Sequence, residues 1–251
     1  MEERVEFQTP CGVTLIGALN FPEKKPTTGV VTCHGMMSTK DGPKHVGLAQ
    51  RITKLGHAVL RFDFQGRGES PGDLLGLSFS RQVDECQAAI NFIRGRGVSR
   101  IALVGSSMGG TVAILAAARE NLAALATLAA VGRPEEMPAR IVGEKGMKHW
   151  QRRGQLRFEG HDIGYSLVED ALRIDVAGLA KKISCPWHII HGSKDEVIPV
   201  SDAQALAQAS GGKAELIIVP GADHQFSQLE IREQLLDDVA AFLDQALRSP
   251  C

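Results

Sequence analysis

Short apolar runs alternate with longer amphipathic stretches along most of the chain. The apolar runs predict strands over residues 14–19, 29–33, 57–62, 101–104, 124–130, 187–191 and 214–219. The longer stretches predict helices over residues 44–54, 79–94, 108–119, 201–209 and 230–246. Several of the strands are continuously apolar, which is typical of parallel strands covered on both faces. We therefore expect an α/β fold with a mostly parallel sheet, opened by an antiparallel pair of strands and flanked by helices.

One segment interrupts this alternation. Residues 133–176 show no clean strand–helix unit, although they contain Trp150, Phe158 and Tyr165. The segment lies between two expected core strands, so it is expected to form a small cap inserted over the end of the sheet. No flexible linker and no internal repeat divides the chain. The prediction is a single domain over residues 1–251 with a cap insertion at about 133–176.

The charge balance and composition limit the classes of function. Lys and Arg total 28 and Asp and Glu total 29, which gives a formal net charge of −1. Such a balance lacks the basic footprint of nucleic-acid binders, so no nucleic-acid partner is expected. With 43% hydrophobic residues and no low-complexity run, the chain has the composition of a folded domain.

Targeting and redox signals are mostly negative. The acidic N-terminus lacks the basic start and apolar stretch of a signal peptide. Charged residues interrupt the most apolar region, residues 111–132, so neither a membrane helix nor a membrane partner is expected. The sequence lacks the C-x-x-C pair that would suggest a metal site. The widely spaced thiols indicate a reducing, cytoplasmic location: Cys11, Cys33, Cys86, Cys185 and Cys251.

The strongest chemical signal is the sequence G-S-S-M-G at residues 105–109, directly after an expected strand and at the start of an expected helix. This is the G-x-S-x-G pattern in a strand–turn–helix context, where the central residue, Ser107, is the candidate nucleophile. The glycines admit a sharp turn at which larger side chains would collide. The helix that follows aims free N–H groups at the reacting oxygen. A plain Gly/Ser turn before a helix is the alternative.

A serine hydroxyl becomes a good nucleophile only when a base takes its proton. His224 is the candidate base, because it lies in a loop just past the last expected strand; a solvated loop histidine is the alternative. The base in turn needs a carboxylate to orient it. Asp195 follows the strand expected at 187–191, Glu196 competes with it, and Asp223 is weaker because it adjoins the histidine. The order serine, acid, histidine along the chain fits a hydrolase triad.

An acyl-transfer enzyme also needs fixed donors for the oxyanion. The backbone N–H of Met108, the residue after the candidate nucleophile, is the first expected donor. The sequence C-H-G-M-M at residues 33–37 ends another expected strand, and Gly35 permits a tight turn that presents the N–H of Met36. A simple turn at His34 and Gly35 is the alternative.

These motifs together resemble the α/β-hydrolase superfamily. They comprise F-D-F-Q-G-R-G-E-S at 62–70, H-G at 34–35, G-S-S-M-G at 105–109, the loop of Asp195 and G-A-D-H at 221–224. More narrowly, the chain is similar to the small bacterial carboxylesterases that include cinnamoyl (feruloyl) esterases. The resemblance covers nearly the whole chain outside the cap.

The resemblance implies an α/β-hydrolase fold with an eight-stranded sheet and a triad of Ser107, Asp195 and His224. It also implies hydrolysis through an acyl-enzyme intermediate without a metal or organic cofactor. Asp63 and Arg67 match the family's structural loop after the fourth strand, which is expected to order the oxyanion turn.

The cap is the part that matches least. Residues 154–158 followed by 164–166 resemble the hairpin and following helix of the feruloyl esterase cap. Trp150 and Tyr165 are therefore candidate substrate-binding residues, together with His34; packing of the aromatic rings between cap and body is the alternative. The stretch 140–157 is basic, and such a run either draws anionic substrates or is a solvated face.

The sequence therefore predicts a serine carboxylesterase whose partner is a small-molecule ester, either an aromatic cinnamoyl-type ester or one with a short acyl chain. A thioesterase and a serine peptidase stay open, because the same groups cleave thioesters and amides. A binding protein that reuses a hydrolase fold is the more remote alternative. The oligomeric state is not fixed by the sequence, and a homodimer stays open.

Overall fold

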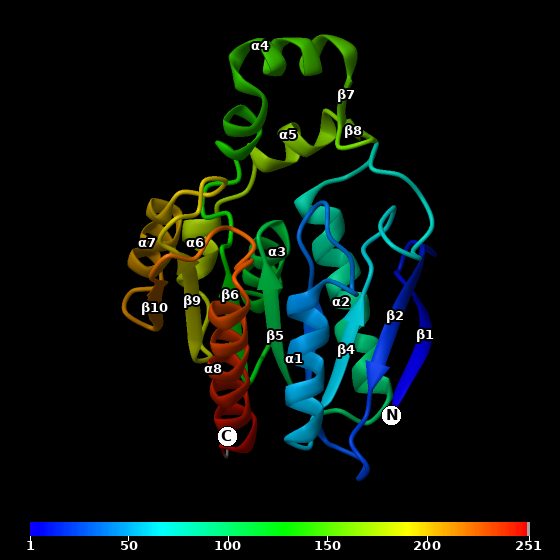
Figure 1. Ribbon diagram of the computed structural model, residues 1–251. Coiled ribbons are helices and arrows are strands. Elements are labelled where there is room, and N and C mark those ends of the chain that lie inside the picture. Colours follow the sequence, from blue (N-terminus) through cyan, green and yellow to red (C-terminus); the bar gives the residue numbers. More distant parts are fainter. Residues whose placement is uncertain (250–251) are drawn as a thin grey trace.

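The computed structural model describes residues 1–249 and contains an eight-stranded sheet of order β1-β2-β4-β3-β5-β6-β9-β10 (Figure 1). β1 pairs antiparallel with β2, β2 pairs antiparallel with β4, and all other neighbours are parallel. The predicted α/β-hydrolase fold with a mostly parallel eight-stranded sheet is thus confirmed. The strands of this sheet are β1 (Glu2–Gln8), β2 (Thr14–Asn20), β3 (Thr28–Cys33), β4 (Ala58–Phe62), β5 (Arg100–Ser106), β6 (Ala124–Leu128), β9 (Trp187–Gly192) and β10 (Ala214–Val219).

Helices cover both faces of the sheet. Apolar residues of α1 (Pro43–Lys54) and α8 (Leu229–Arg248) pack in one core layer, on the face that is in front in Figure 1. Residues of α2 (Phe79–Gly95), α3 (Met108–Ala117), α6 (Val176–Ala180) and α7 (Val200–Ala209) pack in the other layer. The central strands β4, β5 and β6 are buried almost throughout, as their continuous apolar runs predict. No helix within residues 1–249 has the length and apolar character needed to cross a bilayer.

The sequence pattern did not predict the range of the first strand. In β1 only Val5 and Phe7 are buried, and the alternate positions are charged or polar and exposed. This is the pattern of an edge strand, which pairs along one side only. The strand predicted over 124–130 ends at Leu128, because Ala129 takes a positive φ of 50°.

Residues 133–176, which we call the cap segment, lie over the carboxyl ends of the parallel strands (Figure 1). The segment contains α4 (Met137–Arg153), the hairpin of β7 (Gln155–Phe158) and β8 (His161–Gly164), and α5 (Ser166–Ala171). The hairpin and α5 occupy the positions at which the sequence resembles a feruloyl esterase cap. The long helix α4 was not predicted. It is interrupted at Gly143, which takes a non-helical conformation, and its exposed polar residues give it little apolar periodicity.

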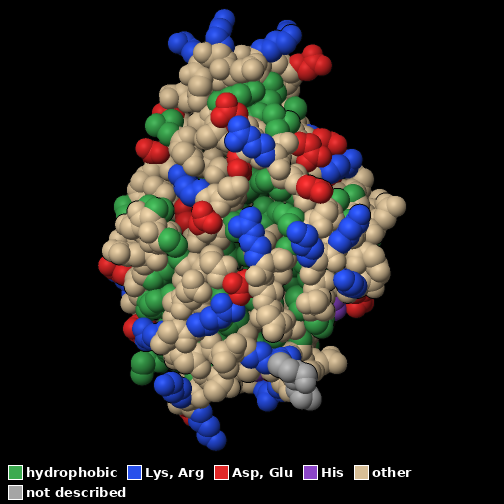
Figure 2. All heavy atoms as spheres, turned by 180° about the vertical axis from the view of Figure 1, so that it is seen from behind, with side chains coloured by type: hydrophobic (Ala, Val, Ile, Leu, Met, Phe, Trp, Pro, Cys, Tyr) green, Lys and Arg blue, Asp and Glu red, His purple; other side chains and the backbone are tan. Residues whose placement is uncertain are grey.

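The cap segment is joined to the body at its first residues by a buried carboxylate. Asp202 in α7 accepts hydrogen bonds from the backbone N–H groups of Gly132 and Arg133, and from the guanidinium groups of Arg133 and Arg140. The outer end of the cap, away from the sheet, is basic. Figure 2 shows Lys and Arg side chains at the outer end of the cap. The exposed cations of α4 are Lys145, Lys148, Arg152 and Arg153.

Candidate active site

The structure places Ser107 at the tip of a sharp turn between β5 and α3. Its backbone has φ 54° and ψ −124°, a conformation that L-residues rarely adopt. The two flanking glycines allow this turn. A Cβ atom at Gly105 would lie 2.2 Å from the Gly109 carbonyl oxygen, and one at Gly109 would lie 2.3 Å from the carbonyl oxygen of His34. The turn therefore brings α3 against the end of β3, as the glycine spacing of the motif predicts.

Three loops at the carboxyl edge of the sheet bring Ser107, His224 and Asp195 together. Ser107 follows β5, Asp195 follows β9 and His224 follows β10. The Ser107 Oγ lies 3.1 Å from His224 Nε2, and His224 Nδ1 lies 2.8 Å from Asp195 Oδ2. Because the carboxylate only accepts, Nδ1 carries the ring hydrogen and Nε2 is left as the acceptor for the serine hydroxyl.

The competing carboxylates lie elsewhere. Glu196 is exposed on the wall of the cavity beside Ser107 and makes no hydrogen bond to His224. Asp223 is occupied by Ser227, whose backbone N–H and hydroxyl both donate to it. Of the three acids that the sequence left open, Asp195 is the one that accepts a hydrogen bond from the His224 imidazole.

The Asp195 carboxylate is held in its ionised form. Burial acts against ionisation, but hydrogen bonds from His191, His224 and the Ile198 N–H outweigh it and hold the pKa well below its usual range. The Oδ1 atom accepts from the N–H groups of Val197 at 2.9 Å and Ile198 at 2.8 Å. A fixed negative charge therefore faces His224 and would stabilise an imidazolium there.

His191 is a residue of this site that sequence reasoning did not assign. Its buried ring lies at the end of β9, with Nε2 at 2.8 Å from the Ile198 carbonyl oxygen and 3.2 Å from Asp195 Oδ2. The same N–H thus holds both the loop and the carboxylate in place. Its position four residues before Asp195 was visible in the sequence, but only the turn of the loop brings the two side chains together.

The turn at residues 34–38 runs beside Ser107. A Cβ atom at Gly35 would lie 3.3 Å from the Ser107 Cβ and 3.4 Å from the Ser106 carbonyl oxygen, so this position leaves little room for a side chain. Within residues 1–249 the Met36 N–H has no hydrogen-bond acceptor. The Met108 N–H is at the first position of α3, where the helix itself offers no acceptor. Two free donors therefore border the serine.

His34 does not line the cavity, and its prediction as a substrate-binding residue was wrong. The ring is buried, and its Nδ1 lies 2.8 Å from the Gly35 carbonyl oxygen. Its Nε2 accepts a hydrogen bond from the Phe64 N–H at 3.0 Å, so both ring nitrogens are occupied. Burial lowers the pKa of His34 to about 4, which keeps the ring neutral in this arrangement.

Arg67 and Asp63 contact the chain that follows this turn. The Arg67 guanidinium donates to the Met37 carbonyl at 2.8 Å and to the Ser38 carbonyl at 3.3 Å. It also lies 2.8 Å from Nε2 of His161 in the cap hairpin. Asp63 accepts from the Lys40 N–H at 2.7 Å. These contacts order the loop after β3 and connect it to the cap.

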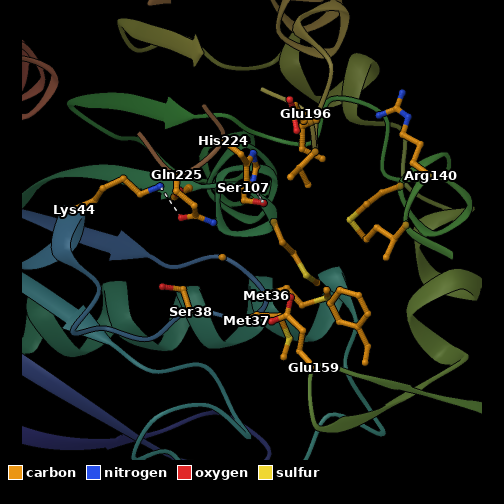
Figure 3. Close-up of a pocket in the computed structure, with 18 of the residues that line it drawn as sticks. Met36, Met37, Ser38, Lys44, Ser107, Arg140, Glu159, Glu196, His224 and Gln225 are labelled. Atoms are coloured by element: carbon orange, nitrogen blue, oxygen red, sulfur yellow. Dashed lines mark hydrogen bonds between the residues drawn. The ribbon is translucent and has the colours of Figure 1, made fainter. Parts of the chain in front are cut away.

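A cavity of about 570 Å³ opens beside Ser107 and His224 (Figure 3). Residues of the turn after β3, the start of α1, the cap segment and the Asp195 loop form its walls. Much of the lining is apolar, and the thioether side chains are Met36, Met37, Met108 and Met137. Its size is within the range of small-molecule sites. Within residues 1–249 no group of three or more His, Cys, Asp or Glu side chains is arranged to hold a metal ion.

The two cap aromatics predicted to bind substrate lie outside this cavity. Trp150 is 3% exposed and donates its indole N–H to the Ile163 carbonyl, so it fastens α4 to the hairpin. Tyr165 packs edge-to-face against Trp150. Both rings therefore have packing contacts, and these contacts join elements of the cap to one another. The cap aromatic that does line the cavity is Phe158, at the end of β7.

Known proteins resemble this chain over most of its length. The family model described as "Serine aminopeptidase, S33" matches residues 24–158. The mitochondrial palmitoyl-protein thioesterase ABHD10 of Rattus norvegicus is 28% identical over 216 residues, which covers 82% of this chain and 71% of that protein. An uncharacterised protein of Mycobacterium tuberculosis is 27% identical over 248 residues, covering 96% of this chain and 79% of that protein.

Solved structures agree in fold. Est1E from Butyrivibrio proteoclasticus with ferulic acid bound superposes with a TM-score of 0.86 at 22% identity, covering 98% of this chain and all of that chain. ABHD10 from mouse superposes with a TM-score of 0.80 at 21% identity, covering 97% of this chain and 99% of that chain. Since the family model spans more than half of the sequence, the chain belongs to the family described as "Serine aminopeptidase, S33", within the α/β hydrolases.

Proposed function

We propose that this protein is a serine hydrolase that cleaves carboxylic esters through an acyl-enzyme intermediate. The observation that carries the proposal is the continuous hydrogen-bonded line from Asp195 through His224 to the Ser107 hydroxyl, at the wall of a cavity large enough for a substrate. Relatives described as an esterase domain and a thioesterase support a hydrolase of acyl groups.

The geometry supports the following sequence of steps. His224 Nε2 takes the proton of the Ser107 hydroxyl, and the oxygen attacks the substrate carbonyl carbon. The N–H groups of Met36 and Met108 receive the oxyanion. The imidazolium, stabilised by Asp195, then returns the proton to the alcohol oxygen as the ester bond breaks. Water enters, loses a proton to His224 and releases the acid from Ser107 by the same steps in reverse.

Two features favour a thioester as the second candidate substrate. A relative is described as a palmitoyl-protein thioesterase, and the methionine side chains of the cavity offer flexible apolar packing for an acyl chain. An aromatic acyl group is the other option. It rests on the likeness to Est1E, solved with ferulic acid bound, and on Phe158 as the aromatic ring in the cavity wall. Parallel assays of a thioester, a ferulate ester and an aliphatic ester rank these classes.

Replacement of the serine tests the proposal directly. Ser107→Ala should lower the kcat for a short p-nitrophenyl ester by at least about 10³-fold, because the nucleophile itself is lost. The neighbouring Ser106→Ala is the matched control, since Ser106 also lines the cavity but makes no hydrogen bond to His224. That variant should stay within about threefold of the wild type.

Labelling with a fluorophosphonate probe separates an enzyme from a binding protein on the same fold. Wild type and Ser106→Ala should react covalently with the probe, whereas Ser107→Ala should not. Ester hydrolysis that survives in Ser107→Ala would refute the proposal. Faster cleavage of an aminoacyl amide than of any ester would instead point to a peptidase.

A further inference from the structure

The charged side chains of the cavity are not equally neutralised. Those in its lining are Lys44, Arg140, Glu159 and Glu196. Arg140 is paired with the Asp202 carboxylate, at 3.0 Å from each oxygen. Glu159 and Glu196 are exposed to solvent. Lys44 differs from the others because it is partly buried and belongs to none of the ion pairs formed by residues 1–249.

The surroundings of Lys44 leave its charge available. Its ammonium lies 3.4 Å from the amide oxygen of Gln225 and 5.4 Å from the ring centroid of Phe226. Burial lowers the pKa of Lys44 to about 8, although Asp223 and Asp195 act in the opposite direction. The group therefore remains mostly protonated at pH 7. The two direct contacts of this half-buried ammonium are neutral, and the carboxylates act on it only from a distance. The ammonium has given up part of its hydration, and an anionic ligand would compensate for that loss.

Among the described residues that line the cavity, Lys44 is the cation on this wall, and Arg232 acts on it electrostatically without lining the cavity. His45, the next residue of α1, also lines the cavity, but burial lowers its pKa well below the ordinary value, with smaller effects from nearby His34 and Lys44. His45 is therefore neutral. Lys44 supplies the positive charge on the α1 side.

The position of Lys44 relative to Ser107 and His224 determines which part of a substrate it would meet. Figure 3 shows Lys44 and Gln225 on one side of Ser107, and the cap residue Arg140 on the other side. Gln225 follows His224 directly in the chain. In the proposed mechanism His224 protonates the leaving oxygen, so the alcohol part of the ester lies toward His224 and its neighbours.

We propose that Lys44 is a specificity-determining residue that binds an acidic group on the alcohol part of the ester. The preferred substrates are then esters whose leaving alcohol carries a carboxylate or a similar monoanion, with an apolar acyl group placed against the methionines and Phe158. This inference rests on the proposed function, because it assumes that Ser107 and His224 cleave an ester.

The test compares p-acetoxybenzoate, whose leaving group carries a carboxylate, with its uncharged methyl ester. At pH 7 the ratio of kcat/KM for the acid to kcat/KM for the methyl ester should fall by about tenfold in Lys44→Met, as expected for a lost charged hydrogen bond. Lys44→Arg should retain most of the preference. Lys54→Met, on the same helix but outside the cavity, is the matched control and should keep the wild-type ratio.

Two further measurements test whether Lys44 binds the acidic group and whether that group is on the alcohol part of the ester. Binding of p-hydroxybenzoate, the leaving group itself, should weaken by a similar factor in Lys44→Met, which reports on Lys44 without turnover. A phenyl ester of adipic acid carries its free carboxylate on the acyl part. The ratio of its kcat/KM to that of the corresponding methyl ester should be the same in wild type and Lys44→Met. If Lys44→Met changed this ratio and left the ratio for p-acetoxybenzoate unchanged, the assignment to the alcohol part would be overturned.

The two proposals fail in different ways. If the wild type hydrolyses neither ester, or if hydrolysis survives in Ser107→Ala, the proposed function is wrong and this inference falls with it. If Ser107 is required but the acid-to-ester ratio is the same in wild type and Lys44→Met, only the role of Lys44 is refuted.

Discussion

The buried ring of His34 controls the direction of a backbone N–H group beside Ser107. The Gly35 carbonyl and the Met36 N–H belong to one planar peptide, so they point in opposite directions. His34 Nδ1 and the Ser38 N–H both hold that carbonyl, at 2.8 Å and 3.0 Å. The Met36 N–H is thereby directed away from them and left without an internal acceptor. In the proposed mechanism His34 is a positioning residue for the oxyanion.

Replacement of His34 by Phe should lower kcat and leave KM within about threefold. An aromatic ring is kept but both hydrogen bonds are lost. A misdirected oxyanion donor should cost about 10- to 100-fold in kcat, somewhat less than removal of the donor. Steady-state kinetics on a p-nitrophenyl ester measure this effect. His149→Phe, exposed on α4, serves as the control. A rise in KM with unchanged kcat would instead return His34 to a substrate-contacting role.

Residue types and their order in the chain pointed to Ser107 and His224 and favoured Asp195 over two neighbouring acids. The structure brings these three residues into one hydrogen-bonded line. Their catalytic roles stay a proposal. Burial was the property that the sequence could not supply: His34 and Trp150 bear polar ring atoms that suit a ligand equally well, yet in the structure these atoms bind backbone groups.

At the level of elements, one carboxylate of α7 connects the cap to the body. Asp202 is fully buried and accepts from Arg133 and Arg140 on both of its oxygens. Burial alone would raise its pKa, but the two guanidinium groups outweigh that effect and lower it. The stability that the ionised Asp202 contributes is therefore present above the ordinary pKa of an aspartate. It is lost as the pH falls through the lowered pKa of Asp202.

Replacement of Asp202 by Asn should destabilise the protein by about 3 kcal/mol at pH 7, because two partly buried arginines lose their counter-ion. Urea unfolding followed by circular dichroism measures the loss. Asp238→Asn, exposed on α8, should change the free energy of unfolding by less than about 0.5 kcal/mol. The Asp202 effect should shrink toward acid pH. An effect of equal size at pH 3 and pH 7 would rule out the charge as its cause.

Periodicity succeeded for strands that are buried throughout and for helices with one buried face, and it failed for two elements that are mostly exposed. The buried strands β3, β5 and β9 lie within a few residues of their predicted ranges. The edge strand β1 and the cap helix α4 expose most of their side chains. In β1 the alternation consists of only two apolar residues, Val5 and Phe7, and α4 has little apolar periodicity. The break at Gly143 further separates α4 into two short pieces.

For the whole molecule, one buried acid should make stability depend on pH near neutrality. Glu85 in α2 is 1% exposed and accepts from the Gln65 N–H at 3.0 Å. Burial raises the pKa of Glu85 to about 7, with Arg81 only partly offsetting it. Because this folded-state value lies above the unfolded value of 4.5, the stability that Glu85 contributes as a neutral acid is lost as the pH rises toward and beyond 7.

The variant Glu85→Gln removes this titration. Its free energy of unfolding relative to wild type should increase by at most about 3 kcal/mol between pH 5 and pH 8, since each pKa unit is worth about 1.4 kcal/mol. Urea titrations at both pH values give the two differences. Glu230→Gln, exposed on α8, should show no such trend. A constant difference between wild type and Glu85→Gln at both pH values would contradict the assignment.

The overall architecture was the most predictable level, because alternating strand and helix signals permit few arrangements of a mostly parallel sheet. The covering of both faces by helices follows from that alternation, whereas the order of the strands was not predicted. Substrate preference was the least predictable, because it depends on which side chains face one cavity. Lys44 and Phe158 are far apart in the sequence and face the same space only after folding.

The left-handed backbone of Ser107 has an evolutionary consequence. At φ 54° a residue with a Cβ atom is more strained than glycine would be. Serine at this position therefore makes the folded state slightly less stable than glycine would. In the proposed mechanism Ser107 is the nucleophile, so selection for turnover would keep that serine in place. In a duplicated gene whose product no longer had to react with anything, the same position would be free to drift to glycine, and the inactive descendant would gain thermal tolerance as it lost its chemistry.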